Sequence, residues 1–222
     1  MERDKLIKIV TELVLKELKY NGGMDTKSPD KKDDSIPTGV SVRHVHLCQA
    51  DLETLYGSGY QLTKRRDLYQ PGEFAAEEVV TLVGPKMRAL ENVRVLGPLR
   101  SKSQVEVSRT DAIFLGITPP VRKSGDLAGS SSLTLVGPKG SLILKEGVIC
   151  ANRHIHMSPS DAERYGVKDD DIVRVAVSGE KALTFENVQI RVKDTFKLEM
   201  HLDTDDANAA GITFGAKAKI IK

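Results

Sequence analysis

The chain contains the segment Arg43-His44-Val45-His46-Leu47 and repeats it with small changes as Arg153-His154-Ile155-His156-Met157. Acidic residues and a Tyr-Gly pair follow each segment, namely Asp51, Glu53 and Tyr56-Gly57, then Asp161, Glu163 and Tyr165-Gly166. In an extended strand alternate side chains point to the same face, so each segment directs two imidazoles to one side and an aliphatic residue to the other. The paired segments therefore predict a duplicated β-strand unit.

A second repeat extends the duplication, because Glu91-Asn92-Val93 recurs as Glu186-Asn187-Val188. Continuing this register without a gap makes Glu106 the equivalent of His201. Each half then offers two imidazoles and one further metal-binding side chain, which uses all five histidines of the chain. Three protein ligands with an open position are typical of catalytic zinc. The ligand sets are His44, His46 and Glu106 in the first half, and His154, His156 and His201 in the second.

These two sets predict a dinuclear metal centre. Imidazole and carboxylate ligands suit zinc, cobalt or another borderline divalent ion, and zinc is the first expectation. The alternative is a group of strand histidines that hydrogen-bond within a core. Because the triplets are duplicated and no histidine is left over, the metal interpretation is favoured.

Length and composition place the chain among globular proteins of one or two domains. Its 222 residues suit one sizeable domain or two of about a hundred residues each, and the duplication favours two. A net charge of +2 gives no reason to expect a nucleic-acid partner or a membrane-surface role. We find no apolar run long enough to span a bilayer and no secretory signal. Cys48 and Cys150 make no disulfide framework and suit a reducing interior.

The N-terminal residues have a different character from the rest of the chain. Apolar and basic residues alternate with helical periodicity over residues 3–19, which predicts an amphipathic helix within residues 1–20. Residues 21–36 are polar and rich in Gly, Asp, Lys and Ser, which is typical of a flexible linker. The helix either docks on its own domain or binds another protein, and the linker favours the second alternative.

From Pro37 onward the pattern is mainly β. Short β-branched runs bounded by Gly, Pro or Asn recur at spacings usual for barrels and sandwiches, for example at residues 79–83, 93–96, 133–136 and 172–175. Short helices are expected after the triplets, at residues 49–57 and 158–166. The first half is expected to span residues 37–117 with part of 118–147, and the second residues 148–222, with strands possibly exchanged between them.

Arg100 is the candidate for binding an anion near the first set. It lies six residues before Glu106, so on a continuous strand the two side chains share a face, and its equivalent in the second half is Thr195. The alternative is an exposed arginine at a strand end. A nearby anion site would favour transfer to another nucleophile over hydrolysis by metal-bound water.

Four segments together resemble the phosphate propanoyltransferase family of bacterial microcompartments, the phosphotransacylases associated with propanediol utilisation. The resemblance runs from about Pro37 to the C-terminus, and its motifs lie at residues 40–47, 97–101 with Glu106, 151–157 and 201–208. It implies reversible conversion of acyl-CoA and phosphate to acyl phosphate and CoA. It also implies two six-stranded β-barrels, a homodimer, and two zinc ions held by the six ligands named above, with Arg100 holding phosphate.

The resemblance also implies contacts with CoA and a cellular location. The positions that match CoA contacts are Ser41, Arg94, Leu96, Arg191 and Asn208. The basic run at residues 64–66 either meets the nucleotide phosphates or is a solvated charged turn. The N-terminal helix resembles the encapsulation peptides that bind shell or cargo proteins, which implies a location inside a microcompartment of the bacterial cytoplasm.

The expected mechanism is direct attack of phosphate on the thioester. All five histidines belong to the two predicted metal sites, so no histidine is left for a Ser-His-Asp triad or a Cys-His pair. Two other classes of function remain open. A metal-dependent thioester or phosphoester hydrolase would use the same ligands without phosphate as acceptor. A structural zinc joining two barrels would lose its metal only on unfolding. The sequence does not separate propanoyl from acetyl substrates, which differ by one methylene.

Overall fold

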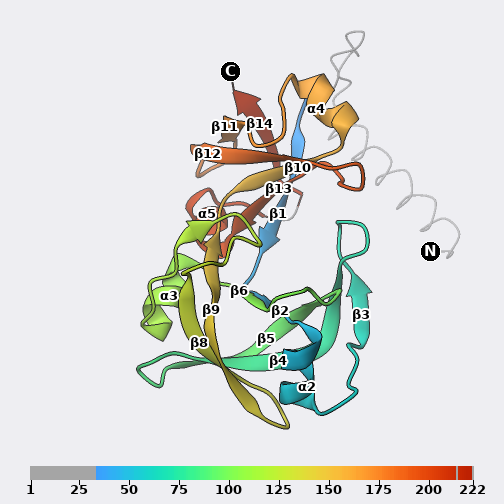
Figure 1. Cartoon of the computed structure of the whole chain (residues 1–222). Helices are drawn as coiled ribbons and strands as arrows, with labels where there is room; N and C mark the ends of the chain where they lie inside the picture. The colour runs from blue at the N-terminus through green and yellow to red at the C-terminus, as the bar shows by residue number, and fades with distance from the viewer. Residues whose placement is uncertain (1–33, 214, 222) are drawn as a thin grey trace, which may run out of the picture. The chain divides into compact units, whose positions relative to one another are not determined.

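The protein is described by a computed structural model in which residues 34–213 and 215–221 are placed. From Ser35 onward the described residues form one compact unit of β-strands and short helices (Figure 1). The predicted amphipathic helix at residues 1–20 lies outside the described residues, and so does the predicted linker up to residue 33. The predicted end of the linker at residue 36 is wrong, because the apolar Ile36 is fully buried as the first residue of a β-strand. In the part of the chain that is described, no helix is long and apolar enough to cross a membrane.

Six strands of the first barrel close in the order β4-β5-β2-β6-β9-β8, with β8 pairing back to β4. They are β2 (His44–His46), β4 (Phe74–Val83), β5 (Ala89–Gly97), β6 (Gln104–Glu106), β8 (Ser131–Val136) and β9 (Ser141–Ala151). Two short strands join this sheet outside the ring, β3 (Lys64–Asp67) on β4 and β7 (Val121–Arg122) on β9. Aliphatic side chains such as Val45, Val95 and Leu135 fill the interior and are fully buried.

Six further strands form the second barrel in the order β1-β13-β10-β12-β11-β14, with β14 pairing back to β1. They are β1 (Ile36–Ser41), β10 (His154–Met157), β11 (Ile172–Val177), β12 (Leu183–Val192), β13 (Glu199–Asp203) and β14 (Lys217–Ile221). Ile155, Ile190 and Met200 lie in a separate, fully buried core. The prediction of a mainly β protein with two six-stranded barrels is confirmed.

The strand that precedes each His triplet belongs to the opposite barrel. β1 comes just before the first triplet but pairs with β13 and β14 of the second barrel. β9 leads directly into the second triplet but pairs with β6 and β8 of the first barrel. Each triplet therefore follows a crossing of the chain from one barrel to the other, and this exchange holds the two barrels against each other.

Equivalent strands of the two barrels pair in the register that the duplication predicts. Val45 lies opposite Val95 in the first barrel, and Ile155 lies opposite Ile190 in the second. The third member of each set likewise faces the first histidine, since His44 pairs with Glu106 and His154 with His201. The two copies thus have the same backbone frame around their histidines.

Short helices close the ends of the barrels. They are α2 (Gln49–Tyr56), α3 (Arg109–Leu115), α4 (Pro159–Tyr165) and α5 (Thr204–Ala209). The helix predicted at residues 158–166 is α4, which begins after a Ser158 capping box and ends at a left-handed Gly166. The helix predicted at residues 49–57 is α2. The arginine before each triplet contacts the helix of its own barrel, with Arg43 2.7 Å from Asp111 and Arg153 3.5 Å from Asp206.

Candidate metal centre

The first candidate group lies where β2 and β6 run side by side. His44, His46 and Glu106 offer ligand atoms that all lie within 4.8 Å of one another. The Nε2 atom of His44 is 3.5 Å from a Glu106 carboxylate oxygen. The other Glu106 oxygen accepts hydrogen bonds from the Gln104 amide and the Ser124 hydroxyl. The carboxylate is therefore fixed from one side while its other oxygen faces the imidazoles.

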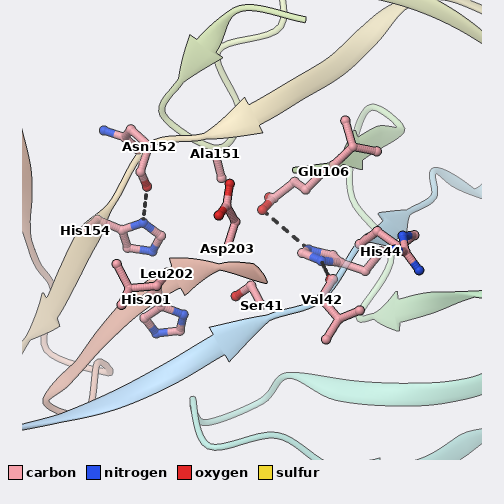
Figure 2. A pocket seen from close by; sticks show the side chains of 12 residues that line it. Ser41, Val42, His44, Glu106, Ala151, Asn152, His154, His201, Leu202 and Asp203 are labelled. Atoms are coloured by element: carbon pink, nitrogen blue, oxygen red, sulfur yellow. Dashed lines mark hydrogen bonds and ion pairs between the residues drawn. The ribbon is translucent and has the colours of Figure 1, made fainter. Parts of the chain in front are cut away.

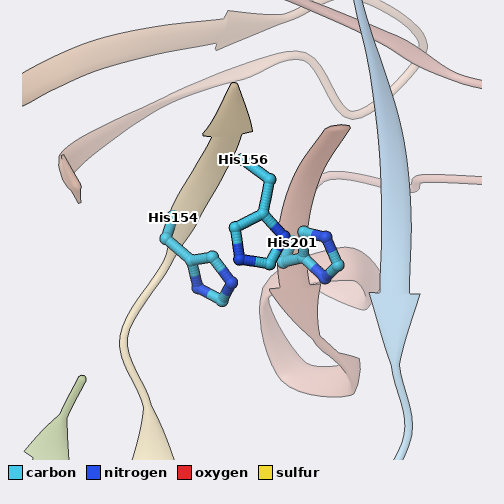
Figure 3. A group of neighbouring side chains, drawn as sticks. All are labelled: His154, His156 and His201. Atoms are coloured by element: carbon cyan, nitrogen blue, oxygen red, sulfur yellow. The ribbon is translucent and has the colours of Figure 1, made fainter. Parts of the chain in front are cut away.

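The second candidate group consists of His154 and His156 on β10 and His201 on β13. Their ligand atoms also lie within 4.8 Å of one another, and Figure 3 shows the three rings turned toward a common point. The ring centroids of His154 and His201 are 4.8 Å apart, and those of His156 and His201 are 4.5 Å apart. Strand alternation explains the arrangement, because Ile155 between the two histidines is fully buried in the core.

Backbone carbonyls set the orientation of the leading histidine in both groups. His44 Nδ1 lies 2.9 Å from the Val42 carbonyl oxygen, and His154 Nδ1 lies 2.9 Å from the Asn152 carbonyl oxygen. A carbonyl only accepts, so Nδ1 carries the proton and Nε2 keeps its lone pair. Histidines that bind metals are commonly held by such a bond to the second ring nitrogen.

The remaining imidazoles have buried nitrogens without hydrogen-bond partners. These atoms are Nδ1 of His46, both ring nitrogens of His156 and Nε2 of His201, which lies 2.9 Å from a Glu199 carboxylate oxygen but makes no hydrogen bond. Such orphaned atoms are rare in proteins and call for an explanation such as a bound ion. Burial, with smaller effects of His44 and Arg100, lowers the pKa of His46 to about 2. Burial, with His201 and Arg191, lowers the pKa of His156 to about 2 as well. Both imidazoles are therefore neutral near pH 7, the form that binds a metal, so these residues fit one.

Glu106 is charged in spite of its burial. Burial alone raises the pKa of this carboxyl, but His44, Arg100 and His154 together lower it below the ordinary value. The influence of His154 is informative, because His154 belongs to the other barrel. The two groups are thus close enough to act on each other electrostatically.

A small cavity of about 20 Å³ separates the two groups. Figure 2 shows His44 and Glu106 on one side of it and His154 and His201 on the other, with Ser41 between them. A space of this size is close to the minimum that holds one water molecule. Members of both groups therefore line the same small cavity between the barrels.

A larger cavity of about 210 Å³ opens beside His46. Its lining consists of His46, Arg100, Glu73, Pro71, Gly72, Gly97 and Pro98. Arg100 donates a hydrogen bond of 2.9 Å to the Ser124 hydroxyl, which in turn donates to Glu106 at 3.1 Å. Burial lowers the pKa of the Arg100 guanidinium, and the charges of Glu106 and Glu73 oppose this shift. Arg100 thus places a positive charge in the cavity next to the first group.

The residues predicted to contact CoA lie in different surroundings. Ser41 lines the small cavity, and Arg191 pairs with His156 across the sheet. Burial lowers the pKa of the Arg191 guanidinium, and the charge of Glu106 opposes this shift. Arg94 pairs with His44, but its guanidinium donates to the backbone oxygens of Ala76 and Glu77 at 3.0 and 2.7 Å. Leu96 is half-buried in β5, and Asn208 is an exposed residue of α5.

The predicted basic run lies in the exposed strand β3. Lys64 is 2.8 Å from Asp67, and Arg65 is 3.5 Å from Glu77. The structure does not bring this run into either candidate group.

Three residues at the site were not predicted from the sequence. Gln104 and Glu199 each lie two residues before the third member of a group, so the duplicated register contained the signal for both. Ser124 belongs to the loop between β7 and β8, and nothing in its local sequence indicates contact with Arg100 and Glu106.

The fold and the site define a protein of two β-barrels that exchange strands, with two groups of side chains that could hold metal ions. Comparison with known proteins gives the family. The family model described as phosphate propanoyltransferase matches residues 37–213. A phosphate propanoyltransferase of Lachnoclostridium phytofermentans is 53% identical over 98% of this chain and 99% of its own length. The phosphate propanoyltransferase of Thermotoga maritima is 57% identical over 86% of this chain and 91% of its own length. That of Salmonella typhimurium is 55% identical over 79% of this chain and 83% of its own length. The chain belongs to the phosphate propanoyltransferase family, and it is an acyltransferase.

Proposed function

We propose that the chain interconverts acyl-CoA and phosphate with acyl phosphate and CoA at a centre of two zinc ions. In the forward direction a phosphate oxygen bonds to the acyl carbon, the carbon–sulfur bond breaks, and the sulfur leaves as a thiolate that takes up a proton. The observation that carries the proposal is the pairing of two metal-competent groups around one cavity, with Arg100 beside the first group.

The six ligands proposed for the two ions are those predicted from the sequence. His44, His46 and Glu106 would hold one ion, and His154, His156 and His201 the other. The fit rests on the orphaned imidazole nitrogens of His46 and His156, and on a donor set that suits zinc. When bound, such ions polarise a carbonyl oxygen and stabilise a thiolate anion.

Arg100 is the residue that we propose binds phosphate. Its guanidinium lines the larger cavity beside His46, and planar guanidinium groups bind phosphate through paired hydrogen bonds. The Ser124 hydroxyl accepts a hydrogen bond from Arg100 and therefore limits the orientations of the guanidinium. Arg100 thereby holds the attacking phosphate next to the first metal group.

Direct attack by phosphate is supported by the lack of a suitable protein nucleophile among the residues that the structure describes. All five histidines are assigned to the two groups, so none serves as base for a Ser or Cys. Cys150 is buried, and burial raises the pKa of its thiol to about 11, which keeps it protonated near pH 7. Trapping an acyl group on Cys150 or Cys48 during turnover would contradict this mechanism.

Ser41, Arg94, Leu96, Arg191 and Asn208 are proposed to contact CoA. Arg191 is the best supported of them, because it adds a second half-buried guanidinium beside Glu106 and Arg100. Propanoyl-CoA and acetyl-CoA are both retained as substrates, since one methylene changes binding by only about 1–3 kcal/mol.

The proposal also includes an assembly and a location. We expect a homodimer inside a bacterial microcompartment, with residues 1–20 as the segment that binds shell or cargo proteins and the residues between 20 and Ile36, the first residue of β1, as its tether. Deleting residues 1–20 is expected to leave the specific activity unchanged and to prevent encapsulation. Loss of activity on this deletion would instead make the helix part of the catalytic fold.

A thiol-release assay with propanoyl-CoA tests the proposed reaction. Release that requires phosphate and yields stoichiometric acyl phosphate supports acyl transfer. Release at the same rate without phosphate would identify a metal-dependent hydrolase instead. Metal that is bound but does not affect turnover, and that leaves only on unfolding, would identify a structural zinc.

A further inference from the structure

Glu199 is a buried acid that the proposed reaction leaves without a role. It lies in β13 two residues before His201, so both side chains point to the same face of the strand. One carboxylate oxygen, Oε2, accepts a 3.0 Å hydrogen bond from the Gln70 side-chain nitrogen. The same oxygen lies 2.9 Å from His201 Nε2, an ion-pair contact in which the ring is not aligned for a hydrogen bond. The residue is only 9% exposed. Its carboxylate is not one of the three mutually close ligands of the second group, so it contacts that group through His201.

The surroundings of Glu199 leave room for a carboxylate and fix its position. A Cβ atom on Gly39 of β1 would lie 2.4 Å from Glu199 Oε1, so the absence of a side chain there makes the space that the acid occupies. Gln70 comes from the first barrel and is held by two bonds to the backbone of Lys197, one donated and one accepted. These bonds aim the Gln70 amide nitrogen at Glu199, so the first barrel supports a carboxylate of the second.

Gln104 is the counterpart of Glu199 in the first barrel, two residues before Glu106. Its amide oxygen accepts a 2.8 Å hydrogen bond from the Gly125 N–H, which leaves its NH₂ to donate to Glu106 and Ser124. The two positions therefore have opposite polarity. In the first barrel a donor faces a carboxylate ligand, and in the second an acceptor faces an imidazole ligand. Each partner matches the hydrogen-bonding chemistry of the third ligand beside it.

We propose that Glu199 is a positioning residue that orients His201 for the metal and supplies the second group with a negative charge, as Glu106 does for the first. This inference rests on the metal centre of the proposed function. A carboxylate that accepts the second N–H of a metal-bound imidazole fixes the ring and raises its basicity. Each group then carries one carboxylate, as a ligand in the first barrel and behind a ligand in the second.

The experiment measures the second group alone, in the full chain carrying His44→Ala and His46→Ala. Affinity for Zn²⁺ is measured by competition with a chelator, and Co²⁺ replaces Zn²⁺ for absorption spectra. Adding Glu199→Gln, which keeps the size of the side chain and removes its charge, is expected to weaken Zn²⁺ binding about 10–100-fold and to shift the Co²⁺ bands. Gln104→Ala in the same background is the matched control. Its affinity should stay within about twofold of the background value, because the hydrogen-bond partners of the Gln104 side chain, Glu106, Ser124 and Gly125, all lie in the first half.

A second variant covers the case in which Glu199→Gln does not fold, as judged by thermal melting with chelator present. Gly39→Ala keeps the acid but displaces its carboxylate, and the atoms that it meets are the end of a flexible side chain. It should also weaken Zn²⁺ binding and shift the Co²⁺ bands. Unchanged affinity in the folded Glu199→Gln or Gly39→Ala protein overturns the positioning role while leaving the metal centre intact. If the background protein with Glu199 present binds no Zn²⁺, the second half of the proposed metal centre fails, and this inference fails with it.

Discussion

The two halves share one backbone frame but differ in the side chains around their histidines. The first group contains a carboxylate, Glu106, and the Ser124 hydroxyl links this carboxylate to Arg100 through hydrogen bonds. The second group has three histidines, and the residue equivalent to Arg100 is the exposed Thr195. The duplication therefore repeats the geometry of the histidines, while the arginine proposed to bind phosphate is present only in the first half. Two unequal copies fit the proposal that one centre holds two different parts of a reaction.

The two halves also differ in the space beside the second histidine of each triplet, which is open in the first half and covered in the second. A cavity of about 210 Å³ opens beside His46. The ring of Phe196 stacks on His156 with 4.0 Å between centroids, and the residue equivalent to Phe196 in the first half is the exposed Ser101. A bulky aromatic residue thus covers the second group where a small residue leaves the first accessible.

Arg100→Ala should have the largest effect on this comparison. Loss of this arginine would remove the charge that we propose holds phosphate, so we expect kcat/KM for phosphate to fall by about 10²–10³-fold. Zinc content should stay the same, because Arg100 is not a ligand. Thr195→Ala is the matched control and should retain nearly full activity. Loss of zinc in the Arg100 variant would mean that the arginine supports the metal group instead.

Ser124→Ala should have a smaller effect, confined to the first group. The hydroxyl accepts from Arg100 and donates to Glu106, so its removal frees both side chains. We expect a loss of about 10–100-fold in activity or in metal affinity of the first group, which is usual for residues that orient ligands. Metal affinity of the second group, measured after replacing His44 and His46, should not change. An equal loss in both groups would contradict the separate roles.

Phe196→Ala should have the smallest effect, on stability. Removing a half-buried ring and its stacking on His156 should lower the free energy of unfolding by about 1–2 kcal/mol. Denaturant unfolding with chelator present measures the change without the contribution of metal. Ser101→Ala at the equivalent exposed position should change stability by less than about 0.5 kcal/mol. Equal effects at the two positions would show that the ring does not cover the second group as described.

Much of the fold could be predicted from the sequence, because its signals are local or repeated. Alternation around Val45 and Ile155 predicts strands, and the copied triplets predict two equivalent halves. The partners of β1 could not be predicted, because Ile36–Ser41 pairs with strands more than 150 residues later in the chain. A strand's own sequence carries little information about which distant edge it joins.

The same limit applies to the candidate site. The register placed Glu106 with His44 and His201 with His154, since equivalent strands keep equivalent pairings. Gln70 and Ser124 come from loops whose positions depend on the packing of the barrels, and their roles became visible only in three dimensions. Arg94 was predicted from the sequence to contact CoA. The structure pairs it with His44, but its guanidinium donates to backbone carbonyl oxygens.

The most direct test of the account is a titration of metal-free protein with Zn²⁺, with thiol release from propanoyl-CoA measured at each step in the presence of phosphate. If both groups form one catalytic centre, activity should rise to its full value only when about two ions are bound per chain, one for each group. Full activity after about one ion, or full activity with no ion bound, would contradict the claim that the two halves act together.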